Sequence, residues 1–195
     1  SFDPYPTSLR LINTVKAVCS GTLSSSKKLI SMVERDCAEL LGKLEYHIMG
    51  NHLLENGLGL FWGGFFLSHK RVFRIGVRIV LSQLREQILA DGGHFERSPM
   101  YHKLMLWRVL DSVNLLAGTG VPEARGVLLA LRRYAHRMSG WLSEYPITAD
   151  IGHMNDSAAG MVPDRPSLLQ YAARLGITPS EKPLQESGFR TLRSA

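Results

Sequence analysis

The stretch Asp91-Gly-Gly-His-Phe-Glu-Arg-Ser-Pro-Met-Tyr-His102 lies between two segments whose apolar residues recur with helical periodicity. It contains two Gly, two His, a Glu, an Arg and a Tyr. A loop that only joins two helices does not need so many side chains capable of acid–base chemistry or ligand binding. Gly92-Gly93 lets the backbone turn sharply or approach a ligand closely. Ser98-Pro99 is typical of a helix start, with Ser as the N-cap and Pro at the first helical position. Tyr101 is therefore expected in the first turn of a helix, near the positive end of its dipole.

A second polar group precedes another apolar segment. Gly50-Asn-His-Leu-Leu-Glu-Asn-Gly57 puts Asn51 and His52 side by side at the start of a helix. The residues between Asn51 and Tyr101 leave room for a helix, a turn, a second helix and a loop. Two such helices would run antiparallel and return the chain to the same end, so we expect Asn51, His52 and Tyr101 to line one cleft.

The rest of the chain is also helical in pattern, and no strand-period pattern precedes residue 176. Glycines from Gly50 to Gly64 indicate that helices approach one another closely. These features predict an all-α fold of antiparallel helical hairpins. The expected helices cover residues 6–18, 27–44, 51–67, 72–89, 99–116, 122–142 and 167–175.

Composition sets further limits. The chain has 195 residues and a formal net charge of +6, which suits either a polyanionic partner or a solvated basic surface. No apolar run reaches the roughly 20 residues that span a bilayer, so no membrane association is expected. No signal peptide or initiator Met is visible, so we expect a piece of a longer protein. Cys19 and Cys37 lack metal-ligand spacing, and two buried free thiols are expected.

Several stretches together resemble the toroid domain of the heparinase II/III-like polysaccharide lyases, which include heparan sulfate lyases and alginate lyases. The specific match is the stretch at residues 91–102, and Asn51-His52 within Asn-His-Leu-Leu-Glu-Asn-Gly57 is the second element. Weaker matches are Asp3-Pro-Tyr-Pro-Thr-Ser-Leu-Arg10, Gly152-His-Met-Asn-Asp-Ser157 and Glu186-Ser-Gly-Phe189.

This resemblance implies an incomplete (α/α) toroid followed by antiparallel β-sandwich domains. Residues 1–176 would form part of the toroid catalytic domain. Residues 177–195 would be a linker, with the possible first strand of a missing β-sandwich domain at residues 188–193. A bacterial protein that is periplasmic or secreted is implied, with a cytoplasmic location left open.

The resemblance also implies a lyase that cleaves a uronic-acid-containing polysaccharide or oligosaccharide by β-elimination. Asn51 and His52 would neutralise the substrate carboxylate, and Tyr101 would act as base, acid or both. A tyrosine ordinarily has a pKa of about 10, so nearby cations must favour the phenolate; Arg97 and either His52 or His102 are candidates. A further catalytic His occurs in some members of the family and is not placed here.

Four more residues are candidates for substrate binding, namely His94, Glu96, Arg97 and His102. Loop bracing is the alternative for His94, and pairing with each other is the alternative for Glu96 and Arg97. Asn155-Asp156 is interpreted as a turn former. No metal-ligand spacing, P-loop or dinucleotide fingerprint occurs, so no metal or cofactor is expected.

Two alternatives to a lyase remain. One is a non-catalytic carbohydrate-binding fragment. The other is a basic helical nucleic-acid-binding domain, which the charge favours. Against it, the basic residues are spread at intervals instead of forming one recognition helix, and we therefore expect no nucleic-acid partner.

Overall fold

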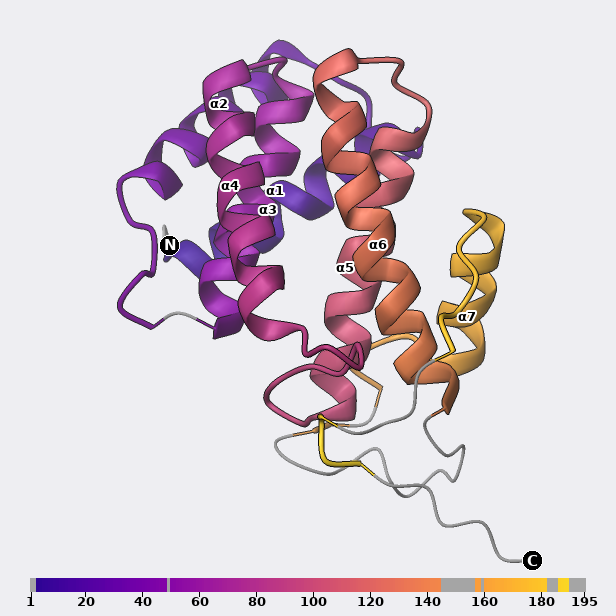
Figure 1. Ribbon diagram of the computed structural model, residues 1–195. Helices are drawn as coiled ribbons and strands as arrows, with labels where there is room; N and C mark the ends of the chain where they lie inside the picture. Colours follow the sequence, from indigo (N-terminus) through magenta and orange to yellow (C-terminus); the bar gives the residue numbers. More distant parts are fainter. Residues whose placement is uncertain (1–2, 49, 145–156, 159, 182–185, 190–195) are drawn as a thin grey trace, which may run out of the picture. The chain divides into compact units, whose positions relative to one another are not determined.

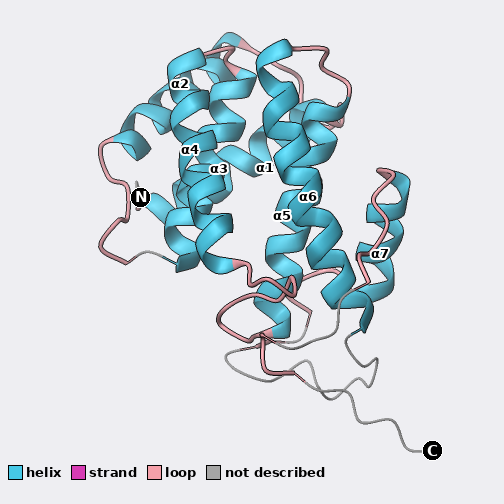
Figure 2. Ribbon diagram, in the orientation of Figure 1, coloured by secondary structure: helices cyan, strands magenta, loops and turns pink. Residues whose placement is uncertain are grey.

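The computed structural model describes residues 3–48, 50–144, 157–158, 160–181 and 186–189 (Figure 1). These residues form helices joined by loops (Figure 2), and the all-α prediction is confirmed. No strand occurs among them, and the one β-bridge joins Ile88 to His94. The expected entry to a β-sandwich is therefore not seen, and its residues 190–193 lie outside the described part.

The helices are α1 (Pro4–Cys19), α2 (Lys27–Leu41), α3 (Gly50–Phe66), α4 (Lys70–Gln87), α5 (Pro99–Ala117), α6 (Pro122–Glu144) and α7 (Arg165–Arg174).

The chain divides into two compact units, Ser1–Leu84 and Arg85–Ala195. The first unit contains α1, α2, α3 and most of α4. Its core is built from apolar side chains of all four helices, which recur at helical spacing and so form one stripe on each amphipathic helix. Those residues are Leu11, Val33, Cys37, Leu40, Leu53, Leu60, Val72 and Ile79.

Glycines allow α3 and α4 to form a tight antiparallel hairpin. A Cβ at Gly64 would lie 2.4 Å from the backbone nitrogen of Phe73, and one at Gly76 would lie 2.3 Å from that of Phe61. Only residues without a side chain permit such backbone contact. The close helix approach predicted from the glycines is confirmed.

The second unit is a hairpin of α5 and α6 with α7 packed against both. Side chains of α6 and α7 satisfy carbonyls that the helix ends leave without an intrahelical partner. Arg132 donates to the carbonyl oxygens of Leu175 and Gly176 just after α7, at 2.9 and 2.8 Å. Arg165 donates to the carbonyl oxygen of Leu142 near the end of α6, at 2.7 Å.

The two cysteines differ in their surroundings. Both are free, but Cys19 is exposed and only Cys37 is buried. The expectation of two buried thiols is therefore wrong for Cys19, which is the last residue of α1 and faces solvent where the helix ends. Burial raises the pKa of the Cys37 thiol to about 12, with a smaller contribution from Asp36.

Candidate active site

Asn51 and His52 lie in the first turn of α3, as expected. Asn51 is largely buried, with 8% of its surface exposed, whereas the His52 side chain is 43% exposed. The first turn of α3 carries no acidic side chain. Its positive dipole end is therefore not neutralised from within the helix, which favours an anionic group beside these residues.

His52 is held from two sides within the first unit. Its Nδ1 lies 3.1 Å from Oε1 of Glu45, a residue in the connection between α2 and α3. Its ring packs against Tyr5 of α1, with centroids 4.7 Å apart. The ring orientation is thus set by a polar and an aromatic contact together.

Glu45 is itself held by a buried hydrogen-bond network. The Asn56 side chain donates to Glu45 Oε2 at 3.0 Å and accepts from the Glu45 backbone N–H at 3.0 Å. Asn56 also donates to Ser8 Oγ at 3.2 Å, and Ser8 donates to the carbonyl oxygen of Pro4 at 2.7 Å. Asn56 and Ser8 are fully buried, and Glu45 is 7% exposed.

Tyr101 lies in the first turn of α5, as the Ser98-Pro99 pattern predicted. The Ser98 hydroxyl accepts from the Tyr101 backbone N–H at 3.3 Å and so caps the helix. Ser98 Oγ also lies 2.8 Å from Ser157 Oγ. Tyr101 is half-buried, and the first turn of α5 carries no acidic side chain.

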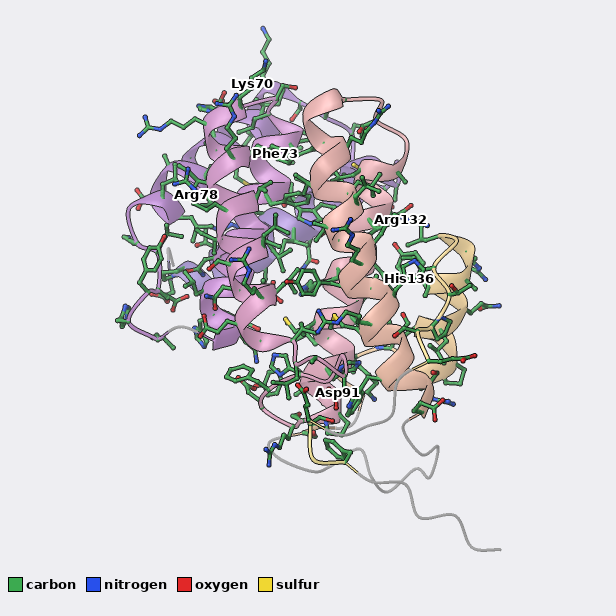
Figure 3. The ribbon with its side chains drawn as sticks, in the orientation of Figure 1. Lys70, Phe73, Arg78, Asp91, Arg132 and His136 are labelled. Carbon is green, nitrogen blue, oxygen red and sulfur yellow. The ribbon has the colours of Figure 1, made fainter. Side chains whose placement is uncertain are left out.

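The loop before α5 is built around the buried carboxylate of Asp91 (Figure 3). Asp91 Oδ2 accepts from the backbone N–H of Ser187 at 2.8 Å and from its hydroxyl at 2.6 Å. Asp91 Oδ1 accepts from the Gly93 N–H at 3.0 Å. Ser187 Oγ in turn accepts from the Trp141 indole N–H at 2.8 Å. The stretch at residues 186–189 is thereby joined to the loop.

His94, in the loop before α5, and His102, in the first turns of α5, are both buried, each with 1% of its surface exposed. His94 Nε2 is 3.2 Å from Gln87 Oε1, and His102 Nε2 is 3.0 Å from the Met138 carbonyl oxygen. Burial lowers the pKa of His94 to about 4 and that of His102 to about 3, the latter with a smaller contribution from His94. His102, one of the candidate cations for Tyr101, is therefore expected to be neutral near pH 7.

Glu96 and Arg97 are exposed in the loop, together with Phe95. Arg97 adopts a left-handed backbone conformation with φ of 55°, and its guanidinium carbon lies 3.6 Å from the position of a Cβ added at Gly188. The Arg97 side chain therefore lies against the 186–189 stretch. Whether Glu96 and Arg97 pair with each other stays a prediction.

The seven predicted site residues divide between the units. Asn51 and His52 belong to the first unit, whereas the second contains Tyr101 and the other four, which are His94, Glu96, Arg97 and His102. The shared cleft stays a prediction. His153, Asn155 and Asp156 lie outside the described residues. Among those that are described, no group of three His, Cys, Asp or Glu side chains is arranged to hold a metal ion.

Glu45 and Asp91 make contacts that are not predictable from the sequence. Glu45 is the single acidic residue in the connection between α2 and α3, and nothing local marks it as a partner of His52. For Asp91, the available signal was that the stretches at 91–102 and 186–189 both matched the same family. They are joined by the bonds between Asp91 and Ser187.

The described residues are helical, with Asn51-His52 in the first turn of one helix and Tyr101 in the first turn of another, after a Gly-rich polar loop. Comparison with known families matches residues 27–124 to the family described as Heparinase II/III N-terminus. The chain therefore belongs to the heparinase II/III N-terminal family, and the resemblance is confirmed. The match covers about half of the chain and includes Asn51, His52 and the loop.

Family membership implies a polysaccharide lyase and a polysaccharide substrate. No curated protein and no solved structure matches the chain. None of the helices in the described ranges is both long and apolar enough to cross a membrane.

Proposed function

We propose that the protein cleaves a uronic-acid-containing polysaccharide or oligosaccharide by β-elimination. The observation that carries the proposal is membership of the heparinase II/III N-terminal family across the residues that include Asn51, His52 and Tyr101. The local geometry supports it, because both polar groups lie in first turns of helices that carry no acidic side chain there. Such turns favour anionic groups.

The chemistry requires three functions. The C5 proton of a uronate becomes acidic enough to remove only when the adjacent carboxylate is neutralised. A base then takes this proton, and the C–H electrons form the C4–C5 double bond. The C4–O bond breaks, and an acid protonates the departing glycosidic oxygen.

Asn51 and His52 act as the neutralising pair in this proposal. The Asn51 amide donates to the carboxylate, and a protonated His52 adds a charge-assisted hydrogen bond. The exposed part of the His52 ring is accessible to such a ligand. The α3 dipole adds a favourable field at the same place.

Tyr101 acts as the proton-transfer residue, as base, acid or both. Its position at the start of α5 favours the phenolate, because the positive dipole end stabilises negative charge. Arg97 is the remaining candidate cation within the same unit. Glu96 and Arg97 are exposed and can contact the sugar directly. His94 and His102 contribute by supporting the loop from inside.

Incubation with alginate, heparan sulfate and hyaluronan tests the proposal. Cleavage is followed by the absorbance of the new C4–C5 double bond, and we expect at least one of these polymers to release unsaturated products. Hydrolysis without such products would contradict β-elimination. Silence on all three polymers, together with tight DNA binding at physiological salt, would favour the nucleic-acid alternative.

A further inference from the structure

The buried network behind His52 has a single consistent set of donors and acceptors. Ser8 donates its only hydroxyl proton to the Pro4 carbonyl, so its oxygen accepts from Asn56. The Asn56 carbonyl oxygen is occupied by the Glu45 backbone N–H. The second Asn56 N–H therefore points to Glu45 Oε2. The amide cannot be reversed, because its NH₂ group would then face a backbone donor.

This chain of bonds determines the role of the Glu45 carboxylate. Asn56 donates to Oε2, and an ionised carboxylate only accepts, so the contact at Oε1 requires a donor from His52. His52 Nδ1 must then carry a proton. The second ring nitrogen, Nε2, is the one left for a ligand, since the first is occupied by Glu45.

We propose that Glu45 is a positioning residue for His52, holding the ring with Nδ1 protonated so that Nε2 meets the carboxylate of the substrate. The assignment of the substrate rests on the proposed function, whereas the hold on the ring follows from the contacts alone. Tyr5 restricts the remaining freedom by packing on the ring.

Replacing Glu45 by Gln makes a specific change in this network. Glutamine has one carbonyl oxygen and one NH₂ group, and the buried Asn56 N–H must face the oxygen. The NH₂ group is then directed at His52, so Nδ1 must accept. We expect the neutral ring to change from the Nδ1–H tautomer to the Nε2–H tautomer.

Long-range ¹H–¹⁵N correlation spectra of the histidine rings measure this change directly. They are recorded at alkaline pH, where imidazole is neutral, and His52→Gln identifies the His52 signals. Wild type should show Nδ1–H at His52, and Glu45→Gln should show Nε2–H. Glu39→Gln is the matched control, because Glu39 is a half-buried residue of α2 that pairs with Lys43 at 3.2 Å. It should leave the His52 tautomer as in wild type.

An Nε2–H tautomer in wild type, or an unchanged tautomer in Glu45→Gln, would overturn the proposed hold of Glu45 on the ring. Turnover provides the second readout. On whichever polymer wild type cleaves, Glu45→Gln should lower kcat by about 10- to 100-fold, similar to the loss of the outer partner of a metal-bound histidine. A tautomer change with unaltered kcat would overturn the positioning role. Absence of cleavage by wild type would refute the proposed function, while the spectra would still report on Glu45.

Discussion

At the scale of single residues, the loop before α5 depends on one buried carboxylate. Asp91 accepts three hydrogen bonds from Ser187 and Gly93, and it is 4% exposed. In Asp91→Asn the new NH₂ group must face at least one of these donors. We expect the free energy of unfolding to fall by about 2 kcal/mol or more. A buried N–H donor is left without an acceptor, and the charged acceptor is lost.

Urea unfolding measures this loss, with Asp164→Asn as the control. Asp164 caps α7 by accepting from the Ser167 N–H at 2.9 Å, and it is exposed. Asparagine is as good an N-cap as aspartate, so the control should change stability little. Equal effects of the two substitutions would show that Asp91 does not hold the loop.

The two buried histidines predict how stability depends on pH. Their pKa values in the folded protein, about 4 for His94 and about 3 for His102, lie below the ordinary value of 6.5. As pH falls below about 6.5, the unfolded chain takes up protons that the folded protein does not. The free energy of unfolding therefore decreases as pH falls from about 6.5, and the decrease stops once the histidines of the folded protein also take up protons. Each contributes a slope of up to about 1.4 kcal/mol per pH unit.

Urea titrations between about pH 7 and pH 5 test this slope. His102→Gln keeps a donor for the Met138 carbonyl and removes one titrating group, so the slope should fall by roughly half. A slope equal to that of wild type would mean that His102 is not buried as a neutral ring. The measurement is independent of catalytic activity.

At the scale of elements, the contact between α3 and α4 depends on missing side chains. A Cβ at Gly64 would lie 2.4 Å from the backbone nitrogen of Phe73, which cannot move aside cheaply. Gly64→Ala should therefore destabilise the protein by about 1–3 kcal/mol or more, as overpacking does.

Gly126, in α6, has nothing within 4 Å of its added Cβ. Gly126→Ala should stabilise by up to about 1 kcal/mol through helix propensity.

Thermal unfolding of both variants gives the comparison, because the same chemical change is made in two helices. The opposite signs are the expected result. If Gly64→Ala were also stabilising, α3 and α4 would not approach as closely as described.

The helices could be predicted from sequence because their signals are local. Apolar periodicity indicated α3 at residues 51–67 and the structure has it at Gly50–Phe66, while Ser98-Pro99 indicated the start of α5 that is observed. The contacts of Glu45 with His52 and of Asp91 with Ser187 could not be predicted. They join polar residues across connections, and a single polar side chain leaves no periodicity that reveals its partner.

At the scale of the whole molecule, charge predicts how a polyanionic substrate binds. The chain carries a formal net charge of +6, and α4 exposes Arg71, Arg74 and Arg78. Added salt screens attraction between exposed charges. The apparent KM for an acidic polysaccharide should therefore rise with ionic strength, with a smaller effect on kcat. A KM independent of salt would show that net charge does not assist binding.

The proposed β-elimination assigns neutralisation of the substrate carboxylate to Asn51 and His52, and proton transfer to Tyr101. Sequence could place each residue in the first turn of a helix. The roles proposed for them in catalysis are not encoded by any local pattern and need a test on the whole protein. Substitution of Tyr101 tests the proposed proton transfer most directly, because it leaves Asn51 and His52 unchanged.

The decisive measurement is the turnover of Tyr101→Phe on whichever acidic polysaccharide wild type cleaves, followed by absorbance of the unsaturated product. Phenylalanine keeps the ring, so stability should change by no more than about 1 kcal/mol. Turnover should fall at least roughly a hundredfold, the contribution of a positioned acid or base. Tyr134→Phe in α6 is the matched control and should retain wild-type turnover. Turnover of Tyr101→Phe near that of wild type would contradict the account, whatever the fold.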